Sequence, residues 1–279
     1  MIPTHGRPDF LAEAIESVLR QRLPVSELVV VDDLGTPETQ ELVESFATRA
    51  TGVAVSYFHR VTGSPGASES RNAGFSETST PLVAFLDDDD IWSPNHLLSA
   101  VNRLRESNAG LSLSWMEVAE PDGFVHDHFS PADGLHAEDV MARNPGITGS
   151  NLVVRRAEFE TISGFDPDLP VSNDKDFLVR YLAANLTYVV VRERTVLHRR
   201  HHQGQLTAWD KRRAVGLAKY IDKHSARLSR QDRRYLKRQI DSIRFRTETG
   251  FRRLAAAVVL VTSTPPRELI YKARERAKK

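Results

Sequence analysis

Four consecutive carboxylates stand in the stretch FLDDDDIW, where Asp87 to Asp90 directly follow a short apolar run. Two ionised carboxylates about 4 Å apart repel each other by about 4 kcal/mol at the effective dielectric constant of roughly 20 found near a protein surface. A cluster of four therefore needs either open water or a cation. Carboxylate oxygens suit Mg²⁺ or Mn²⁺, which also take phosphate oxygens as ligands. The run is either a solvated acidic loop or a divalent-metal site.

A second pair of acids favours the metal site. Asp32 and Asp33 end the run ELVVVDD, which is typical of a buried parallel strand. The run LVAFL ends in the same way at Asp87. In doubly wound α/β sheets, ligands bind at the carboxyl ends of the strands. Acids at two such ends can converge on one crevice, so we expect both groups to face one ligand.

The segments that would position these acids alternate between helix and strand patterns. Apolar residues recur at helical spacing in some segments, and short β-branched or apolar runs separate them. The predicted helices cover residues 8–21, 37–48 and 70–77, and the predicted strands cover residues 27–33, 53–59 and 82–86. This alternation predicts an α/β fold with a doubly wound, mostly parallel sheet.

The composition indicates a globular chain without a membrane span. Of the 279 residues, 40% are hydrophobic and 27% are charged, which suits one large domain or a domain with an appendage. The longest apolar run, Leu254 to Val261, is much shorter than the roughly 18 residues that cross a bilayer. No signal peptide is predicted, and the lack of cysteine excludes disulfides and thiolate metal sites. We therefore expect a cytoplasmic protein.

Charge divides the chain into an acidic body and a basic tail. Residues 211–279 carry 21 Lys and Arg against 6 Asp and Glu, whereas residues 1–210 carry 17 against 31. The tail is predicted to be helical over residues 229–250, 251–262 and 266–277, with Ser229 as a cap. Its basic faces suit anionic lipid, nucleic acid or the acidic body. Few aromatic residues are interleaved, so nucleic acid is the weakest partner. Helical packing with peripheral contact on the inner face of the membrane is favoured.

Four blocks of the sequence resemble a known family in their order and spacing. They are IPTHGRPDFLAEAIESVLRQ, ELVVVDD, GASESRNAGFSETSTPLVAFLDDDDIWSPNHL and GFDPDLPVSNDKDFLVRYL. Over residues 1–207 the chain is similar to the family 2 glycosyltransferases of GT-A fold, a Rossmann-like α/β fold. The resemblance implies an inverting enzyme that moves a sugar from a nucleotide diphosphate donor. It also implies a nucleotide-binding half at 1–110, an acceptor half at 111–207 and a basic helical extension at 208–279.

The resemblance also implies which residues bind the nucleotide. Matched to the family's blocks, the residues at the base or the phosphates are Thr4, His5, Arg7, Asp32, Asp33 and Arg71. The family often has an aromatic residue at the position of His5, and an imidazole can also stack on a base. The family's Asp-x-Asp falls on Asp87 and Asp89, with Asp88 available to the ribose. Asp89 is the first choice for a Mn²⁺ or Mg²⁺ ligand, followed by Asp87.

A histidine in the segment LHRRHHQGQLT, residues 197–207, is expected to complete the metal or diphosphate site. His202 matches the family best, with His201 and His198 as neighbours. A basic cluster of histidine and arginine is otherwise a solvated loop or an anion patch. The candidate metal ligands are therefore Asp89, Asp87 and His202.

The acceptor hydroxyl must lose its proton, and the segment VSNDKDFLVRYL holds the candidate base. The family has Glu-Asp here, whereas this sequence has Asn173 and Asp174. Asp174 matches the family's general base at the start of a helix, and Asp176 is the alternative. A helix amino end also stabilises a carboxylate, so a cap is the other interpretation of Asp174. The change to Asn173 removes a charge and leaves the role of that position open.

The expected donor carries uridine as the first choice of base, thymidine as the next and guanosine as the third. The expected acceptor is a hydroxyl of a glycan, of a lipid-linked precursor or of a small natural product. A second copy of the chain is among the partners considered. The family's first strand has about five apolar residues before the Pro-Thr pair, and here only Met1 and Ile2 precede it. We expect a short first strand, or a start that lies upstream.

Other classes of function stay open at this point. A phosphatase with an aspartyl nucleophile also places Asp-x-Asp after a strand, but early in the chain and with a downstream pair of lysine and acid. A nucleotidyltransferase would bind the same metal and nucleotide, yet its glycine-rich amino-terminal loop is missing here. A catalytically inactive nucleotide-sugar-binding module is the third alternative, because Asn173 replaces an acid.

Overall fold

The computed structural model describes residues 1–61, 63, 66–201 and 211–263, and the contacts divide the chain into two units. Unit 1 comprises Met1–Pro167 and Asn173–Gln203, and unit 2 comprises Asp168–Ser172 and Gly204–Lys279. The predicted boundary between residues 207 and 208 lies outside the described residues, so it stays a prediction. Each unit is described by itself.

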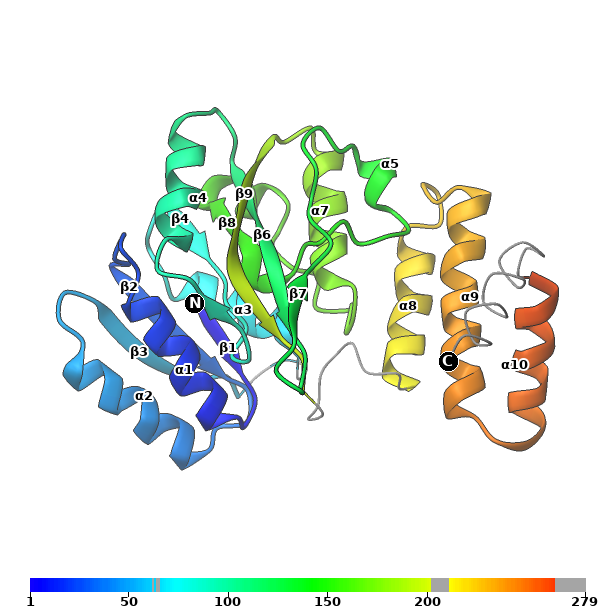
Figure 1. The fold of residues 1–279 in the computed structure, drawn as a ribbon, viewed down its shortest axis with the longest axis horizontal. Coiled ribbons are helices and arrows are strands. Elements are labelled where there is room, and N and C mark those ends of the chain that lie inside the picture. The colour runs from blue at the N-terminus through cyan, green and yellow to red at the C-terminus, as the bar shows by residue number, and fades with distance from the viewer. Residues whose placement is uncertain (62, 64–65, 202–210, 264–279) are drawn as a thin grey trace. The chain divides into compact units, whose positions relative to one another are not determined.

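The first half of unit 1 is a small parallel sheet with its connecting helices (Figure 1). Its elements are β1 (Ile2–Thr4), α1 (Pro8–Leu19), β2 (Glu27–Asp32), α2 (Pro37–Arg49), β3 (Ala54–His59) and α3 (Ala67–Ser76). The three strands pair in the order β1-β2-β3, and both pairs are parallel. Proline occupies the first turn of α1 and of α2, where its missing N–H costs nothing. The first strand is short, as expected.

The second half of unit 1 has a mixed sheet. Its elements are β4 (Leu82–Ala84), β5 (Ile91–Trp92), α4 (His96–Arg105), β6 (Leu111–Ala119), β7 (Val125–Asp127), α5 (Ala137–Val140), a 3₁₀ turn (Gly149–Asn151), β8 (Leu152–Arg155), α6 (Arg156–Thr161), α7 (Asn173–Ala183) and β9 (Tyr188–Arg199). The order is β4-β8-β6-β9-β5, and β7 pairs with the end of β6, over Glu117–Ala119. Strands β6 and β9 run parallel, and the remaining pairs are antiparallel.

One hydrophobic core joins the two halves of unit 1. Buried side chains from both sheets form a single cluster, which includes Ile2, Val30, Leu86, Met116 and Val196. The backbone N–H of Leu86 donates to the carbonyl of Met1 at 3.1 Å, so the segment after β4 lies beside β1. The predicted α/β architecture is confirmed, and the acids that follow β2 and β4 are brought to the same edge.

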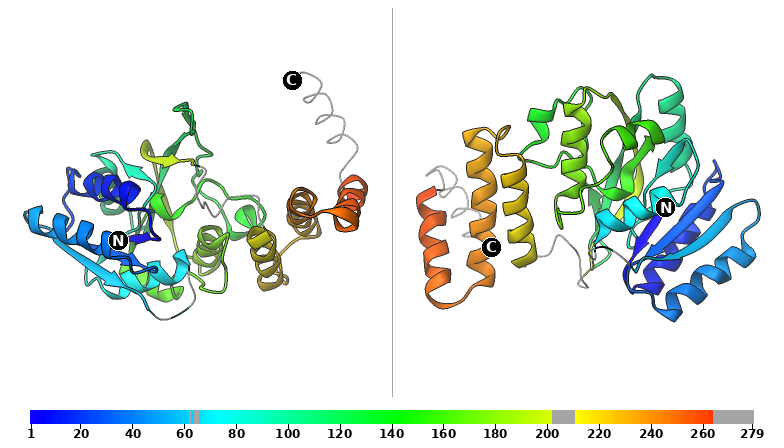
Figure 2. Two further views of the ribbon diagram at one scale, coloured as in Figure 1. Left: turned by 90° about the horizontal axis from the view of Figure 1, so that it is seen from below. Right: turned by 180° about the vertical axis from the view of Figure 1, so that it is seen from behind.

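Unit 2 contributes three described helices, α8 (Lys211–Lys223), α9 (Arg230–Thr247) and α10 (Gly250–Ser263). The helix α9 packs against both α8 and α10 (Figure 2). Ser229 caps α9 by accepting the N–H of Asp232, which confirms the predicted cap. In the described part of the chain, every helix is too short or too polar to cross a membrane. The predicted helix at residues 266–277 lies outside the described residues.

Candidate functional site

The four acids of the opening stretch form a turn whose side chains alternate in exposure. The N–H of Asp90 donates to the carbonyl of Asp87 at 3.1 Å, which closes the turn. The exposed side-chain fractions are 26% for Asp87 and 11% for Asp89, against 1% for Asp88 and 0% for Asp90. Asp87 is therefore the most open of the four carboxylates, Asp89 keeps a small exposed fraction, and these two stand at the Asp-x-Asp spacing. We refer to Asp87 to Asp90 as the acidic turn.

The buried carboxylate of Asp88 is held by protein donors. Arg7 donates to it through Nε at 3.2 Å and through Nη2, and the hydroxyl of Thr4 donates at 2.7 Å. Burial raises the pKa of Asp88 to about 7, although the charge of Arg7 opposes this shift. Thr4 and Arg7, predicted at the nucleotide base, are thus joined to the acidic turn. The ribose contact predicted for Asp88 would have to displace these partners, and it stays a prediction.

The other buried acid, Asp90, anchors the turn to the second sheet. Its oxygens accept from the hydroxyl of Ser150 at 2.5 Å and from the backbone N–H of Arg199 at 3.1 Å. The imidazole Nδ1 of His198 lies 3.0 Å away. Burial alone would lower the pKa of His198, but the charge of Asp90 raises it to about 9. The hydroxyl of Ser150 also accepts the N–H of Asp87 at 3.0 Å, so one serine fixes both ends of the turn.

The carboxylate of Asp89, whose side chain is largely buried, meets a histidine. Its Oδ2 lies 2.9 Å from Nε2 of His201 and 2.9 Å from Nη1 of Arg7. Neighbouring ligands of an octahedral divalent ion, each about 2.1 Å from it, are about 3 Å apart. The oxygen of Asp89 and the nitrogen of His201 therefore fit two adjacent positions around such an ion. His202, the histidine predicted here, lies outside the described residues, so its role stays a prediction.

The described residues do not form a complete protein cage for a metal. Within residues 1–61, 63, 66–201 and 211–263, no group of three or more His, Cys, Asp or Glu side chains is arranged to hold an ion. Magnesium-type ions usually bind through one or two carboxylates and take substrate phosphates and water as their other ligands. The donors Asp89, His201 and Asp87 suit an ion of this kind, which would bind together with a diphosphate.

A buried arginine connects the acidic turn to the candidate base. Arg71, on α3, is buried, and its Nη2 lies 2.5 Å from Oδ1 of Asp87. Its Nη1 lies 3.4 Å from Oδ1 of Asp174, and its guanidinium stands over the ring of Phe165 at 5.0 Å. Its Nε is buried and has no hydrogen-bond partner among the described residues. A single cation thus joins two carboxylates that are far apart in the sequence.

The candidate base stands at the start of α7, next to Asn173, whose side chain contacts both α7 and α3. The N–H of Asp174 donates to the amide oxygen of Asn173 at 2.8 Å, and the amide nitrogen of Asn173 donates to Ser68 at 3.1 Å. Asn173 therefore ties α7 to α3, the helix that carries Arg71. Burial raises the pKa of Asp174 to about 6, although the charge of Arg71 lowers it. A carboxylate with this pKa is suited to accept a proton near neutral pH.

Asp176, the alternative catalytic base, has a different partner from Asp174. Its side chain is fully buried, and Nε of Arg180 donates to it at 2.7 Å. Arg180 in turn donates to the carbonyls of Ile162 and Gly164. The pair holds α7 against the loop that precedes it, which is a structural role. The geometry thus favours Asp174 of the two acids.

The acids after β2 have different surroundings. Asp33 lies 2.5 Å from Nδ1 of His5 and accepts the N–H of Gly66 at 3.2 Å, on the open edge of the first sheet. Asp32 has no exposed surface, and its oxygens accept from the N–H groups of Leu34 and Thr36 and from the hydroxyl of Tyr57. The carboxylate of Asp32 thus holds its own loop, so the predicted contact of Asp32 with a nucleotide base would have to displace these partners, and it stays a prediction. His5 and Asp33 remain candidates for contact with the nucleotide base.

Sequence reasoning missed the residues that support the site from a distance. Ser150, Ser68 and Gly149 carry no motif of their own, and the partners that give them a role lie far away in the chain. Gly149 is the clearest case, because a Cβ at this position would lie 2.2 Å from Nη2 of Arg71. The arginine therefore needs a residue without a side chain beside it.

Replacing Gly149 by alanine should push Arg71 away from Asp87 and Asp174. The guanidinium is buried and held on both sides. We therefore expect at least a tenfold loss of turnover, as the displacement of a group by about 1 Å commonly causes. Steady-state kinetics measure the loss, and thermal unfolding checks that the fold persists. Wild-type turnover in Gly149→Ala would mean that the position of Arg71 does not matter.

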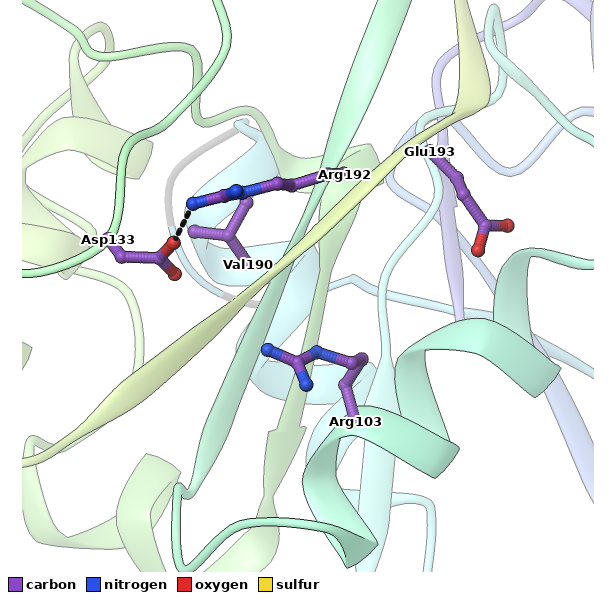
Figure 3. Close-up of a pocket in the computed structure, with 5 residues that line it drawn as sticks. All are labelled: Arg103, Asp133, Val190, Arg192 and Glu193. Carbon is purple, nitrogen blue, oxygen red and sulfur yellow. Dashed lines mark hydrogen bonds and ion pairs between the residues drawn. The ribbon is translucent and has the colours of Figure 1, made fainter.

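One surface cavity lies apart from these residues. It has a volume of about 540 Å³ and is lined by Arg103, Asp133, Val190, Arg192 and Glu193 (Figure 3). Arg192 is paired with Asp133 at 2.7 Å, whereas Arg103 and Glu193 extend from α4 and β9 on its other sides. None of the candidate residues described above lines it. The acidic turn, rather than this cavity, is the candidate site.

The chain is similar in sequence to known proteins. The family model described as Glycosyl transferase family 2 matches residues 1–161. The succinoglycan biosynthesis protein ExoW of Rhizobium meliloti is 30% identical over 171 residues, which cover 58% of this chain and 49% of that protein. The chain spans between 49% and 61% of the length of three curated relatives that it matches.

Solved structures share the fold at lower identity. TarS 1–349 of S. aureus, in complex with UDP-GlcNAc, has a TM-score of 0.65 at 16% identity, over 95% of this chain and 81% of that chain. The mannosyltransferase PcManGT of Pyrobaculum calidifontis, in complex with GDP-Man and Mn²⁺, also has a TM-score of 0.65, at 18% identity over 100% and 79%. These similarities show a GT-A fold.

Proposed function

The chain belongs to glycosyl transferase family 2, and from that premise we propose that it transfers a sugar from a nucleotide diphosphate donor to an acceptor hydroxyl. The single observation that carries the proposal is the bridge made by Arg71 between Asp87 and Asp174. It places the acidic turn, which suits a diphosphate, next to a carboxylate whose pKa suits a base. Neither a solvated loop nor a simple helix cap requires such a bridge.

We propose that Asp89, Asp87 and a histidine of the segment after β9 hold a Mn²⁺ or Mg²⁺ ion. His201 is the described histidine beside Asp89, and His202 stays a second candidate. When bound, the ion acts as a Lewis acid that neutralises the charge developing on the departing diphosphate. Arg71 adds a fixed positive charge beside Asp87. Its guanidinium is buried and already in position, so it does not have to reorganise as negative charge develops.

The donor is proposed to lie across the edge of the two sheets. Its base would meet His5 and Asp33, which hold each other at 2.5 Å, and its phosphates would meet the acidic turn. Arg7 contacts Asp88 and Asp89, so it positions the turn from the nucleotide side. UDP-sugars are the first choice of donor and dTDP-sugars the next. TarS was solved with UDP-GlcNAc, which supports that order, and PcManGT with GDP-Man keeps guanosine as the third choice.

Asp174 is proposed to accept the proton of the acceptor hydroxyl. The hydroxyl then attacks the anomeric carbon from the face opposite the phosphate, so the reaction inverts the configuration there. Asn173 holds the backbone of Asp174, and Arg71 limits the rise of its pKa. The acceptor is proposed to be a hydroxyl of a glycan, of a lipid-linked precursor or of a natural product.

Donor turnover by the purified chain tests the proposal. We expect UDP release from UDP-glucose, UDP-galactose or UDP-GlcNAc, with dTDP-glucose and GDP-mannose as further donors, and we expect it to need Mn²⁺ or Mg²⁺. Release of phosphate from an aryl phosphate would support an aspartyl phosphatase instead. Formation of pyrophosphate from a nucleoside triphosphate would support a nucleotidyltransferase. Binding of a donor with no turnover would indicate an inactive binding module.

The pH dependence of turnover should report Asp174. Burial raises its pKa to about 6, and the carboxylate must be unprotonated to act as a base. The value of kcat/KM should therefore be flat above about pH 7 and fall about tenfold per pH unit below pH 6. The variant Asp174→Asn should lose this acidic limb. A limb centred near pH 4 would contradict the assignment.

Unit 2 is proposed to make peripheral contact with anionic lipid. Residues 211–263 carry 15 Lys and Arg against 4 Asp and Glu. Phe251 and Leu254 are exposed, and they lie three residues apart on α10. A basic surface combined with apolar side chains is what binding to an anionic bilayer requires. Sedimentation with phosphatidylglycerol vesicles, but not with phosphatidylcholine vesicles, is the expected result.

A further inference from the structure

The hairpin formed by β6 and β7 presents apolar side chains to solvent. Phe124 is 63% exposed, Val125 is 47% exposed, and Phe129, just after β7, is 80% exposed. The two phenylalanines have different surroundings. The ring of Phe124 stacks on His126 near the tip of the hairpin, whereas the ring of Phe129 meets the edge of His128. An exposed aromatic ring is costly in water, so its place in the fold is informative.

The backbone around Phe129 is firmly held. The N–H of His128 donates to the carbonyl of Met116 at 3.1 Å, and the indole N–H of Trp115 donates to the carbonyl of Pro131 at 3.1 Å. The carbonyl of Phe129 packs so closely on Gly146 that a Cβ there would lie 1.9 Å from it. A fixed backbone with an exposed ring is a preorganised contact, because little conformational freedom is lost when a ligand covers it.

Two series of contacts link the segment of Phe129 to the acidic turn. The ring of His128 lies 6.2 Å from that of His198, whose Nδ1 contacts Asp90. On the other side, Gly146 accepts a hydrogen bond from Asn151, which directly follows Ser150, the residue that holds both ends of the acidic turn. Two separate routes thus connect the segment of Phe129 to the turn.

A different route connects the proposed nucleotide-base site to the turn. His5 and Asp33 belong to the first sheet and reach the turn through Thr4 and Arg7. The segment of Phe129 reaches it through the second sheet. In the proposed function the nucleotide base occupies the first of these routes, which leaves the second to the acceptor.

We propose that Phe129 is a stacking platform for a pyranose ring of the acceptor, an inference that rests on the proposed function. One face of a pyranose exposes C–H bonds that carry partial positive charge, and the face of an aromatic ring is negative. Phenylalanine offers this face without a polar group, so it recognises the apolar side of a sugar ring rather than its pattern of hydroxyls. The acceptor class is thus a sugar with a free apolar face.

The test compares three variants. Phe129→Leu keeps an apolar side chain but removes the aromatic face, whereas Phe129→Trp keeps an aromatic face. Phe124→Leu is the matched control, because it removes another exposed ring, 63% against 80% exposed, from the far end of the same hairpin. Saturation-transfer NMR with the methyl glycosides of glucose, galactose and mannose, in the presence of UDP and Mn²⁺, measures the contact directly.

We expect ring C–H protons of at least one glycoside to be saturated in the wild type, in Phe129→Trp and in Phe124→Leu. In Phe129→Leu the dissociation constant should rise about tenfold. No saturation in the wild type, an equal loss in Phe124→Leu, or undiminished binding in Phe129→Leu would overturn the platform. A change of oligomeric state in Phe129→Leu would show that a second copy covers the ring, and would overturn it too.

Donor turnover keeps this inference separate from the proposed function. UDP release by the wild type in the absence of a glycoside depends on the acidic turn and not on Phe129. A wild type that releases no UDP from any donor would refute the proposed function, whatever the NMR shows. A wild type that turns over donor but does not contact a glycoside through Phe129 would refute the platform alone.

Discussion

Alanine in place of Asp89 should abolish the dependence on divalent metal and lower transfer by about 10³-fold, the scale of losing one electrostatic contact to a developing anion. Its carboxylate is the member of the turn that meets His201. Arg7 keeps Asp88 as a partner, and Asp89 lies outside the apolar core, so the fold should persist. Calorimetric titration of UDP with Mn²⁺ measures the loss of donor affinity.

The variant Asp133→Ala is the matched control for Asp89→Ala. It also removes a carboxylate that contacts an arginine, but in the cavity of Figure 3, apart from the acidic turn. Its metal dependence and turnover should match those of the wild type. Equal binding of UDP with Mn²⁺ by Asp89→Ala and the wild type would mean that Asp89 holds no metal.

The change Asp174→Asn should depress kcat by 10²- to 10⁴-fold, the usual contribution of a general base. The amide has nearly the shape of the carboxylate but accepts no proton at neutral pH. Arg71 keeps its contact with Asp87, so donor and metal binding should stay near the wild-type values. Transfer kinetics and titration of UDP with Mn²⁺ should therefore separate this variant from Asp89→Ala.

The variant Asp176→Asn is the control for the choice of base. It removes the partner of Arg180 from a fully buried pair, so its main effect should be a lower unfolding temperature. Asp174→Asn should change that temperature little. A loss of kcat in Asp176→Asn at unchanged unfolding temperature, with normal kcat in Asp174→Asn, would make Asp176 the base.

Much of the fold was predictable, because the signals involved are local. The spacing of apolar residues in α1 and the run that forms β2 depend on neighbours within a few positions. The predicted strand at residues 82–86 ends at Ala84, although Phe85 and Leu86 are buried. The second sheet is mixed, since β8 returns antiparallel to both β4 and β6. No pattern within β8 indicates which strands it will pair with.

Part of the candidate site was predictable in the same way. The acidic turn and the acid at the start of α7 were visible as residues of one type at a strand end and a helix start. The use of each acid was not visible, because it depends on partners elsewhere in the chain. Asp32 is the example, since its carboxylate proves to hold its own loop and the hydroxyl of Tyr57.

The sequence by itself determined the elements over residues 8–86, the order in which they occur and the collection of carboxylates at strand ends. The tertiary structure alone decided that Asp87 and Asp89 keep exposed surface, whereas Asp88 and Asp90 are enclosed. The enclosing and facing groups come from distant positions, as Ser150 lies 60 residues from Asp90 and His201 lies 112 residues from Asp89. Four identical side chains in a row become different only when burial and distant charges act on each of them separately.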